Sequence, residues 1–214
     1  MSTSEETAHI SNNISSLPRY SKPSNISIQK ERNKIQNNVD ITIIEIISDL
    51  LKNICEKTNS GDSNTNLNIQ KFFITKRIPS ISLRDYLIRL VQFSKIEEST
   101  LIFILIYLDR FCKFTNIQLT YNNIHKLILT SMFIAIKFNE DRHYSLDIYA
   151  KIGGVPPQEL ECMEFYFLIF IQFNLNVNKD LYDKYYNNLK SFEEECNDED
   201  LYEDDELNND DDEQ

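Results

Sequence analysis

The feature that most constrains the fold is a run in the middle of the chain that is apolar on every side. Residues 101–108 read LIFILIYL, and Phe111 continues the run after one charged pair. Isoleucine and phenylalanine favour strands locally, but the segment 97–113 contains no turn residue and is too long for an ordinary strand, so its length favours a helix. A helix that is apolar all round must be buried all round. The apolar stretch is far too short to span a bilayer, so it predicts the centre of a packed helical core.

Further segments with helical spacing lie on both sides of this central helix. Ser82 is expected to cap a helix over 83–93, and Thr120 a helix over 120–138, because their hydroxyls accept hydrogen bonds from the free amides at a helix start. The remaining helices are predicted over 39–56, 145–152, 157–173 and 179–189. The sequence thus predicts an all-α fold: a five-helix domain with an extra N-terminal flanking helix and a short C-terminal helix.

Two adjacent glycines mark a boundary between two of these helices. Gly153 and Gly154 stand where the helix over 145–152 is expected to stop, since glycine readily adopts the left-handed backbone that ends helices. Pro156 and Pro157 follow, and proline suits the first turn of the next helix.

Composition divides the chain into three parts. Residues 1–38 are rich in serine and asparagine and are predicted to be disordered, residues 39–190 to form the domain, and residues 191–214 to form a disordered acidic tail. From 193 to 214 the chain carries fourteen acidic residues and no lysine or arginine. Such a tail repels phosphate backbones, so no nucleic-acid partner is expected.

The chain lacks the side-chain patterns of common enzyme and metal sites. Its cysteines (Cys55, Cys112, Cys162, Cys196) are far apart, and no cysteine and histidine cluster has the spacing of a metal site. No glycine-rich phosphate loop and no nucleophile–histidine arrangement is present. We therefore expect no metal, no cofactor and no catalysis. The absence of a signal-like start and of paired cysteines is typical of the cytoplasm or nucleus, with no membrane partner.

Five short motifs, in order, resemble the cyclin box. They are ISLRDYLIRLVQFS (81–94), IYLDRF (106–111), TSMFIAIKFNED (130–141), YAKIGGV (149–155) and ELECMEFYFLIFIQFNL (159–175). The first and fourth are most similar to P-type cyclins, which are named from the phosphate-response pathway of fungi. The resemblance covers about 72–177 and a single box, since the mostly acidic remainder cannot hold a second.

The resemblance implies a regulatory subunit that forms a heterodimer with a cyclin-dependent protein kinase and activates it. In the family, a lysine of the third helix and a glutamate of the fifth reach the mobile αC helix of the kinase, and here they correspond to Lys137 and Glu164. Carried over on the same basis are five apolar contacts: Ile134, Phe138, Leu168, Phe173 and Leu175.

Simpler interpretations stand beside these assignments. Lys137 and Glu164 fit an ordinary surface ion pair of small energetic value. About half of the five apolar positions are expected to be core. Asp109 and Arg110 are predicted to be structural, with at least one of them paired and partly buried.

One residue departs from the general cyclin pattern. The arginine that usually pairs with the second-helix aspartate falls on Ser80 here, and Arg84, one turn later, is its candidate replacement opposite Asp109. The sequence leaves open whether this pair forms.

Two other functions remain open from the sequence. The same fold could bind a transcription or trafficking factor and no kinase. It could also bind nucleic acid, which requires a basic face, and the candidates for one are Lys71, Lys76, Arg77, Arg84 and Arg89. The identity of the kinase, and whether its signal is phosphate supply or cell-cycle progress, is not encoded in any motif.

Overall fold

The computed structural model describes residues 39–59, 71–141 and 143–203, and after Ser191 it describes the backbone alone. Every regular element in these ranges is a helix, which confirms the all-α prediction. The helices are α3 (Ile41–Asn59), α5 (Leu83–Ser94), α6 (Glu98–Thr115), α7 (Ile124–Asn139), α8 (Leu146–Gly153), α9 (Pro157–Phe170) and α10 (Lys179–Glu203). The disorder predicted for 1–38 and the end of the acidic tail lie outside the described residues.

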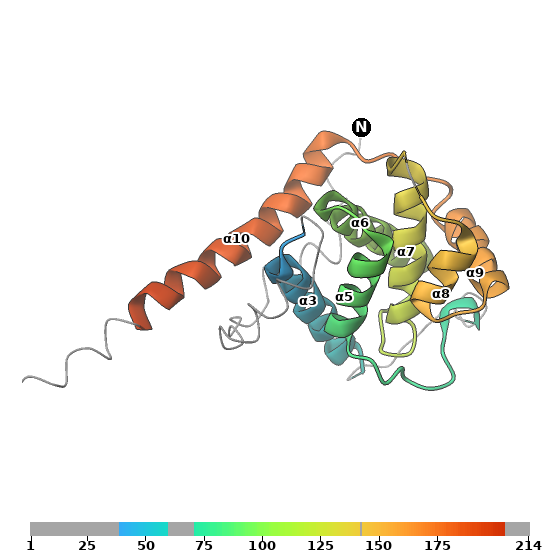
Figure 1. Ribbon diagram of the computed structural model, residues 1–214, viewed down its shortest axis with the longest axis horizontal. Coiled ribbons are helices and arrows are strands. Elements are labelled where there is room, and N and C mark those ends of the chain that lie inside the picture. The colour runs from blue at the N-terminus through green and yellow to red at the C-terminus, as the bar shows by residue number, and fades with distance from the viewer. Residues whose placement is uncertain (1–38, 60–70, 142, 204–214) are drawn as a thin grey trace, which may run out of the picture.

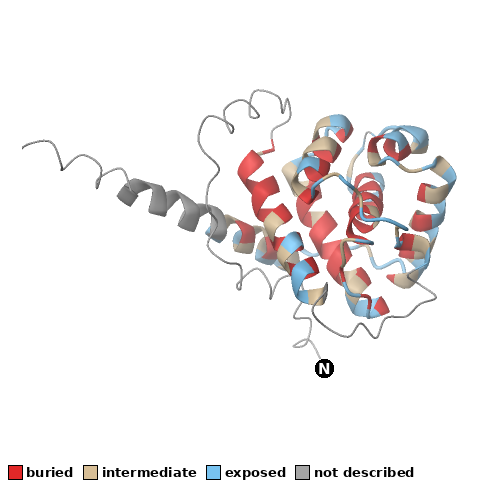
Figure 2. Cartoon of the chain, turned by 90° about the horizontal axis from the view of Figure 1, so that it is seen from below, coloured by how far each residue is buried: buried red, intermediate tan, exposed pale blue. Residues whose placement is uncertain are grey.

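The core is built around α6 and α7, which pack against each other (Figure 1). From Thr100 to Asp109 only Phe103 of α6 is not buried, and the first thirteen residues of α7 are buried except Lys126. The predicted central helix is thus confirmed. α5, α8 and α9 surround this pair, and Figure 2 shows buried residues concentrated inside the helical body.

α3 is more deeply buried than its predicted amphipathic stripe suggested. Between Ile41 and Leu51 only Asp49 is not buried, and even the polar Thr42, Glu45 and Ser48 are enclosed. Among the described helices α3 packs on α5 and α10. It is therefore part of the core rather than an addition to its outside.

Several helix ends differ from the sequence prediction. Ser82 caps α5 as expected, accepting from the Asp85 amide at 3.0 Å. Thr120 does not cap α7, because 121–123 form a turn in which the Asn123 side chain accepts from the Thr120 amide at 2.8 Å, and the helix starts at Ile124. Sequence composition alone cannot distinguish such a turn from a first helical turn.

The C-terminal helix is much longer than predicted. α10 continues to Glu203, through residues assigned above to the disordered tail, and its second half projects from the body (Figure 1). The physical reason is that no glycine or proline interrupts 179–203, while Glu, Leu, Lys and Phe all tolerate a helix.

Candidate protein-docking surface

Lys137 and Glu164 lie side by side at the junction of α7 and α9. Lys137 occupies the last turn of α7, where a cation is favoured by the helix dipole, and Glu164 lies in the middle of α9. The Lys137 Nζ atom is 2.5 Å from the Glu164 Oε1 atom. The lysine side chain is 43% exposed and the glutamate side chain 14%, so a partner can reach the lysine directly and the glutamate at its edge.

The apolar positions carried over by resemblance divide into three groups. Phe138 and Phe173 are 55% and 65% exposed, which is unusual for phenylalanine. Leu168 and Leu175 are partly buried against the core. Ile134 is only 2% exposed, because α7 is enclosed by its neighbouring helices, so it is one of the positions that belong to the core.

Two exposed residues of α9 were missed by the sequence analysis. Phe165 and Ile169 are 57% and 41% exposed and lie one turn apart, each directly after Glu164 and Leu168 in the chain. The second half of α9, residues 165–170, is apolar at every position, which predicts burial, yet in the whole helix only Leu160, Met163 and Phe167 are buried. The run of apolar residues around this half of the helix could have indicated them, because apolar residues that the core cannot cover form exposed patches, and large exposed apolar patches mark interaction sites.

The segment after α9 holds Phe173 away from the body. α9 was predicted to continue to Phe173, but it ends at Phe170, and Gln172 and Phe173 both adopt left-handed backbone with φ of 54°. A bulky side chain rarely takes this conformation, and where one does, function is a reasonable hypothesis.

Two side chains of α6 fix this segment by its carbonyl groups. The Tyr107 hydroxyl donates to the Leu175 carbonyl at 2.9 Å. The Arg110 guanidinium donates to the carbonyls of Asn174 at 2.7 Å and Asn176 at 2.8 Å. Arg110 therefore anchors the loop that carries Phe173 and Leu175.

Asp109 and Arg84 each have a partner in the body of the protein. Asp109 is 4% exposed and accepts a hydrogen bond from the Tyr185 hydroxyl of α10. Arg84 pairs with the buried Glu45 of α3, with 2.8 Å between Nη2 and Oε1. Arg84 thus links α5 to α3. No local sequence pattern identifies Glu45 as its partner.

The two glycines at the end of α8 have different roles. Gly154 has a φ of +74° and forms the left-handed cap that the sequence predicted. Gly153 lies within α8, where a Cβ atom would be 2.2 Å from the Leu129 Cδ2 atom of α7. Gly153 is therefore needed for close helix packing.

The described residues offer little for catalysis or metal binding. No three His, Cys, Asp or Glu side chains among them gather closely enough to hold a metal ion. Burial raises the pKa of Cys55 to about 12 and raises that of Cys112 as well, so neither thiol is a nucleophile at neutral pH. None of the described helices combines the length and apolar character that crossing a membrane requires.

The described residues thus form an all-helical domain with exposed apolar side chains on α7, on α9 and in the segment after α9. The sequence profile of the cyclin family matches residues 2–175, so this chain belongs to the cyclin family. Cyclin-U4-2 of Arabidopsis thaliana is 35% identical over 152 residues, which cover 69% of both chains. Cyclin-P4-1 of Oryza sativa subsp. japonica is 29% identical over 148 residues, 67% of this chain and 70% of that one.

A fungal relative indicates which type of cyclin this chain resembles. The PHO85 cyclin-like protein psl1 of Schizosaccharomyces pombe is 35% identical over 108 residues, which cover 50% of this chain and 44% of that one. Together with the rice relative it confirms the predicted resemblance to P-type cyclins. Cyclins are regulatory proteins, so a regulatory role follows from the family.

Proposed function

We propose that this cyclin binds a cyclin-dependent serine/threonine protein kinase through α7, α9 and the loop after α9, and thereby activates it. One observation carries the proposal: the exposed cation of Lys137 pairs with the Glu164 carboxylate between α7 and α9, and the ends of these two helices carry exposed rings, Phe138 directly after Lys137 and Phe173 three residues after α9. This is the chemistry that receives the end of a helix. Ammonium and carboxylate groups pair with the free carbonyls and amides there, while the rings cover the apolar side of that helix.

Activation requires that the docked helix be the mobile αC helix of the kinase. Holding αC inward brings its glutamate to the lysine that contacts the ATP phosphates. The cyclin performs no chemistry in this scheme. It binds the active arrangement of the kinase more tightly than the inactive one, and this difference in affinity shifts the population.

The competing nucleic-acid function is less well supported by the same geometry. Of the five basic residues considered for a basic face, Arg84 pairs with Glu45 and Arg89 donates to the Lys151 carbonyl at 3.2 Å. Lys71 lies 5.0 Å from the centre of the Phe72 ring. A phosphate-binding face would need these cations to be available together.

The first experiment identifies the chains that copurify from native cells and then compares two matched double variants. Lys137→Ala with Glu164→Ala removes the proposed contact. Lys126→Ala with Glu159→Ala removes another ion pair between the same two helices, 2.7 Å long and at the opposite end of α7. We expect the first variant to bind the kinase at least roughly 30-fold more weakly, as for interface hot spots, and the second to bind normally.

Stimulation of phosphate transfer by the purified kinase tests activation separately from binding. Equal kinase binding by both double variants, with equal thermal stability, would remove Lys137 and Glu164 from the site. Recovery of partner proteins but no kinase would favour the alternative function, in which the same fold binds a transcription or trafficking factor.

A further inference from the structure

The segment that leads into α5 is a loop on the outside of the packed helices (Figure 1). At its start, Thr75 donates to the Asn122 carbonyl from its amide at 2.8 Å and from its hydroxyl at 2.9 Å. At its end, the Ile81 carbonyl oxygen lies 3.2 Å from the His125 Nε2 atom. The stretch between these two anchors, residues 76–80, is therefore held in place at both ends.

The middle of this loop has no hydrogen bond to the described part of the chain. None of the backbone amides and carbonyls of 76–80 pairs with another described residue, and neither does the Ser80 hydroxyl. Lys76, Arg77 and Ser80 are exposed, and Ile78 is 58% exposed. Another protein can bind such a segment in extended form, because its backbone groups are free to pair across an interface.

The order of side chains in the loop suits one class of enzyme. Arg77 stands three residues before Ser80, and Lys76 stands four residues before it. A guanidinium group binds carboxylates through two parallel hydrogen bonds, so a protein kinase with acidic groups beside its catalytic centre can use this arginine to position the serine hydroxyl. The proposed docking surface does not involve Ser80.

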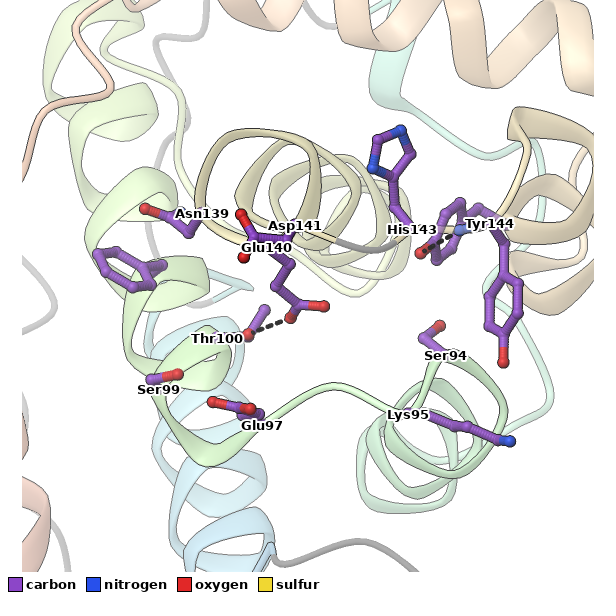
Figure 3. A pocket seen from close by; sticks show the side chains of 12 residues that line it. Ser94, Lys95, Glu97, Ser99, Thr100, Asn139, Glu140, Asp141, His143 and Tyr144 are labelled. Carbon is purple, nitrogen blue, oxygen red and sulfur yellow. Dashed lines mark hydrogen bonds between the residues drawn. The ribbon is translucent and has the colours of Figure 1, made fainter.

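A second serine has the same arginine spacing in a different setting. An arginine also stands three residues before Ser145, and no other serine or threonine of the chain besides Ser80 has this spacing. The Ser145 carbonyl accepts from the amides of Ile148 at 3.1 Å and Tyr149 at 3.3 Å, where α8 begins. The Tyr144 amide donates to the Tyr149 hydroxyl at 3.1 Å, as Figure 3 shows. The backbone around Ser145 is thus engaged in the fold, whereas that around Ser80 is open.

We propose that Ser80 is a phosphorylation site for a serine/threonine protein kinase that selects an arginine three residues before its target. The Ser80 Oγ atom attacks the γ-phosphorus of ATP, and the bond from this phosphorus to the β-phosphate oxygen breaks. ADP leaves, and the hydroxyl proton passes to the catalytic aspartate of the modifying enzyme. This chain is the substrate of that reaction, so the proposal does not depend on which kinase the cyclin binds.

The phosphate would change the charge of the loop and give its cations a partner. At pH 7 the group carries a charge of about −1.5 to −2, which offsets Lys76 and Arg77. The nearest acidic side chain in sequence is Asp85, which is 63% exposed and already lies 3.8 Å from the Arg84 guanidinium. Attraction to the two cations therefore outweighs repulsion from this carboxylate, and we expect the modified loop to be more rigid.

Phosphorylation rates in the folded chain and in free peptides test the proposal. The probe is the catalytic subunit of the cyclic-AMP-dependent protein kinase, which selects arginine, with ATP, and mass spectrometry measures each serine separately. Peptides of residues 73–85 and 138–150 give the rate of each serine without the fold. We expect Ser80 of the full chain to react within about threefold of its peptide. Ser145 should react at least about tenfold more slowly than its peptide, because its backbone must first be released from α8.

Matched variants test the role of the arginine. Arg77→Ala should slow the phosphorylation of Ser80 at least about tenfold with unchanged thermal stability, because this side chain is exposed. Lys71→Ala, which removes another exposed cation before the loop, should leave the rate within about twofold. In the phosphorylated chain, amide exchange across 76–82 should slow at least roughly threefold, and unchanged exchange would contradict the pairing with Lys76 and Arg77.

Two results would overturn the proposal. One is that Ser80 of the folded chain reacts about tenfold or more slowly than its peptide, as Ser145 is expected to do. The other is a rate at Ser80 that Arg77→Ala does not change. Neither result alters the test of Lys137 and Glu164, which uses the unmodified chain, so the two proposals fail independently.

Discussion

His125 is held neutral inside the protein on α7. It is 6% exposed, its Nε2 atom lies 3.2 Å from the Ile81 carbonyl oxygen, and its ring packs edge-on against Tyr86 at 5.0 Å. Its Nδ1 atom is buried without a partner in the structure. Burial lowers the pKa of His125 below its usual value, because an imidazolium here would have no compensating charge.

This environment predicts a loss of stability in mild acid. The unfolded chain takes up a proton on His125 near pH 6.5 and the folded chain only at lower pH, so stability falls as the pH drops below about 6.5, by at most about 1.4 kcal/mol per pH unit. His125→Gln keeps a donor for the Ile81 carbonyl and should lose less stability between pH 7.5 and 5.5 in urea unfolding. Asp49 and Glu140, whose pKa values burial raises, contribute with the opposite sign in both chains. Parallel pH profiles for the two chains would contradict the assignment.

Single residues show what the sequence can and cannot predict. Lys137 and Glu164 were assigned by motif, and the structure places them in contact. The left-handed Gly154 was predicted from composition. Gly153 and the Arg84–Glu45 pair were not, because each depends on how close two helices approach, and no local pattern contains that distance.

At the scale of elements, the segment 171–178 follows α9 in the chain but is held in place by side chains of α6. Tyr107 and Arg110, one turn apart on α6, hold three successive carbonyls of this segment. The left-handed backbone at Gln172 and Phe173 is maintained by these bonds and by the Phe173 amide, which donates to the Leu168 carbonyl at 2.9 Å. The position of the exposed Phe173 ring therefore depends on α6.

Removing this anchor should loosen the segment while the bundle remains folded. Arg110→Ala deletes two hydrogen bonds, each worth about 1 kcal/mol, so we expect amide exchange across 171–177 to accelerate by roughly tenfold or more. Hydrogen–deuterium exchange of α7 should not change. Arg89→Ala, which removes the bond to the Lys151 carbonyl, is the matched control. Unaltered exchange in 171–177 after Arg110→Ala would show that the anchor has no such role.

Helix existence could be predicted at this scale, but several helix ends could not. Apolar spacing, the length of the apolar run over 97–113 and the glycine and proline boundaries at 153–157 located the helices between 83 and 170. The start of α7 was misplaced because a hydrogen bond to the Asn123 side chain forms a turn before the helix. The end of α9 was misplaced because Arg110 binds two carbonyls of the segment that follows it. The end of α10 was misplaced because no glycine or proline stops this helix. Such effects depend on tertiary contacts or on single residues, and the spacing of apolar residues over a whole helix does not reveal them.

The whole molecule depends on two helices, α3 and α10, that lie outside residues 72–177. Nine apolar side chains of α3 are buried, and α10 contributes the buried Tyr185 and Leu189. The nine are Ile41, Ile43, Ile44, Ile46, Ile47, Leu50, Leu51, Ile54 and Cys55. Burial of that many apolar side chains is worth on the order of 15 kcal/mol, comparable to the entire stability of a typical domain.

A fragment limited to the cyclin box should therefore fail to form a stable native state. Residues 72–177 lack both α3 and α10, so we expect broad, weakly cooperative unfolding and binding of a hydrophobic dye. A chain that ends at Lys190 keeps all described buried residues and should unfold cooperatively like the full chain. Circular dichroism during heating compares the three, and a sharp transition for residues 72–177 would show that the flanking helices are dispensable.

The contact between α3 and α10 joins two helices that are nearly 120 residues apart in sequence. The ribosome makes α3 and α5 before α10, the helix that completes the enclosure of α3. Until α10 is made, the side of α3 that α10 covers therefore stays open in the nascent chain, and such an apolar surface is one that chaperones bind and from which aggregation starts. Folding of α3 into its final position is consequently tied to the synthesis of α10.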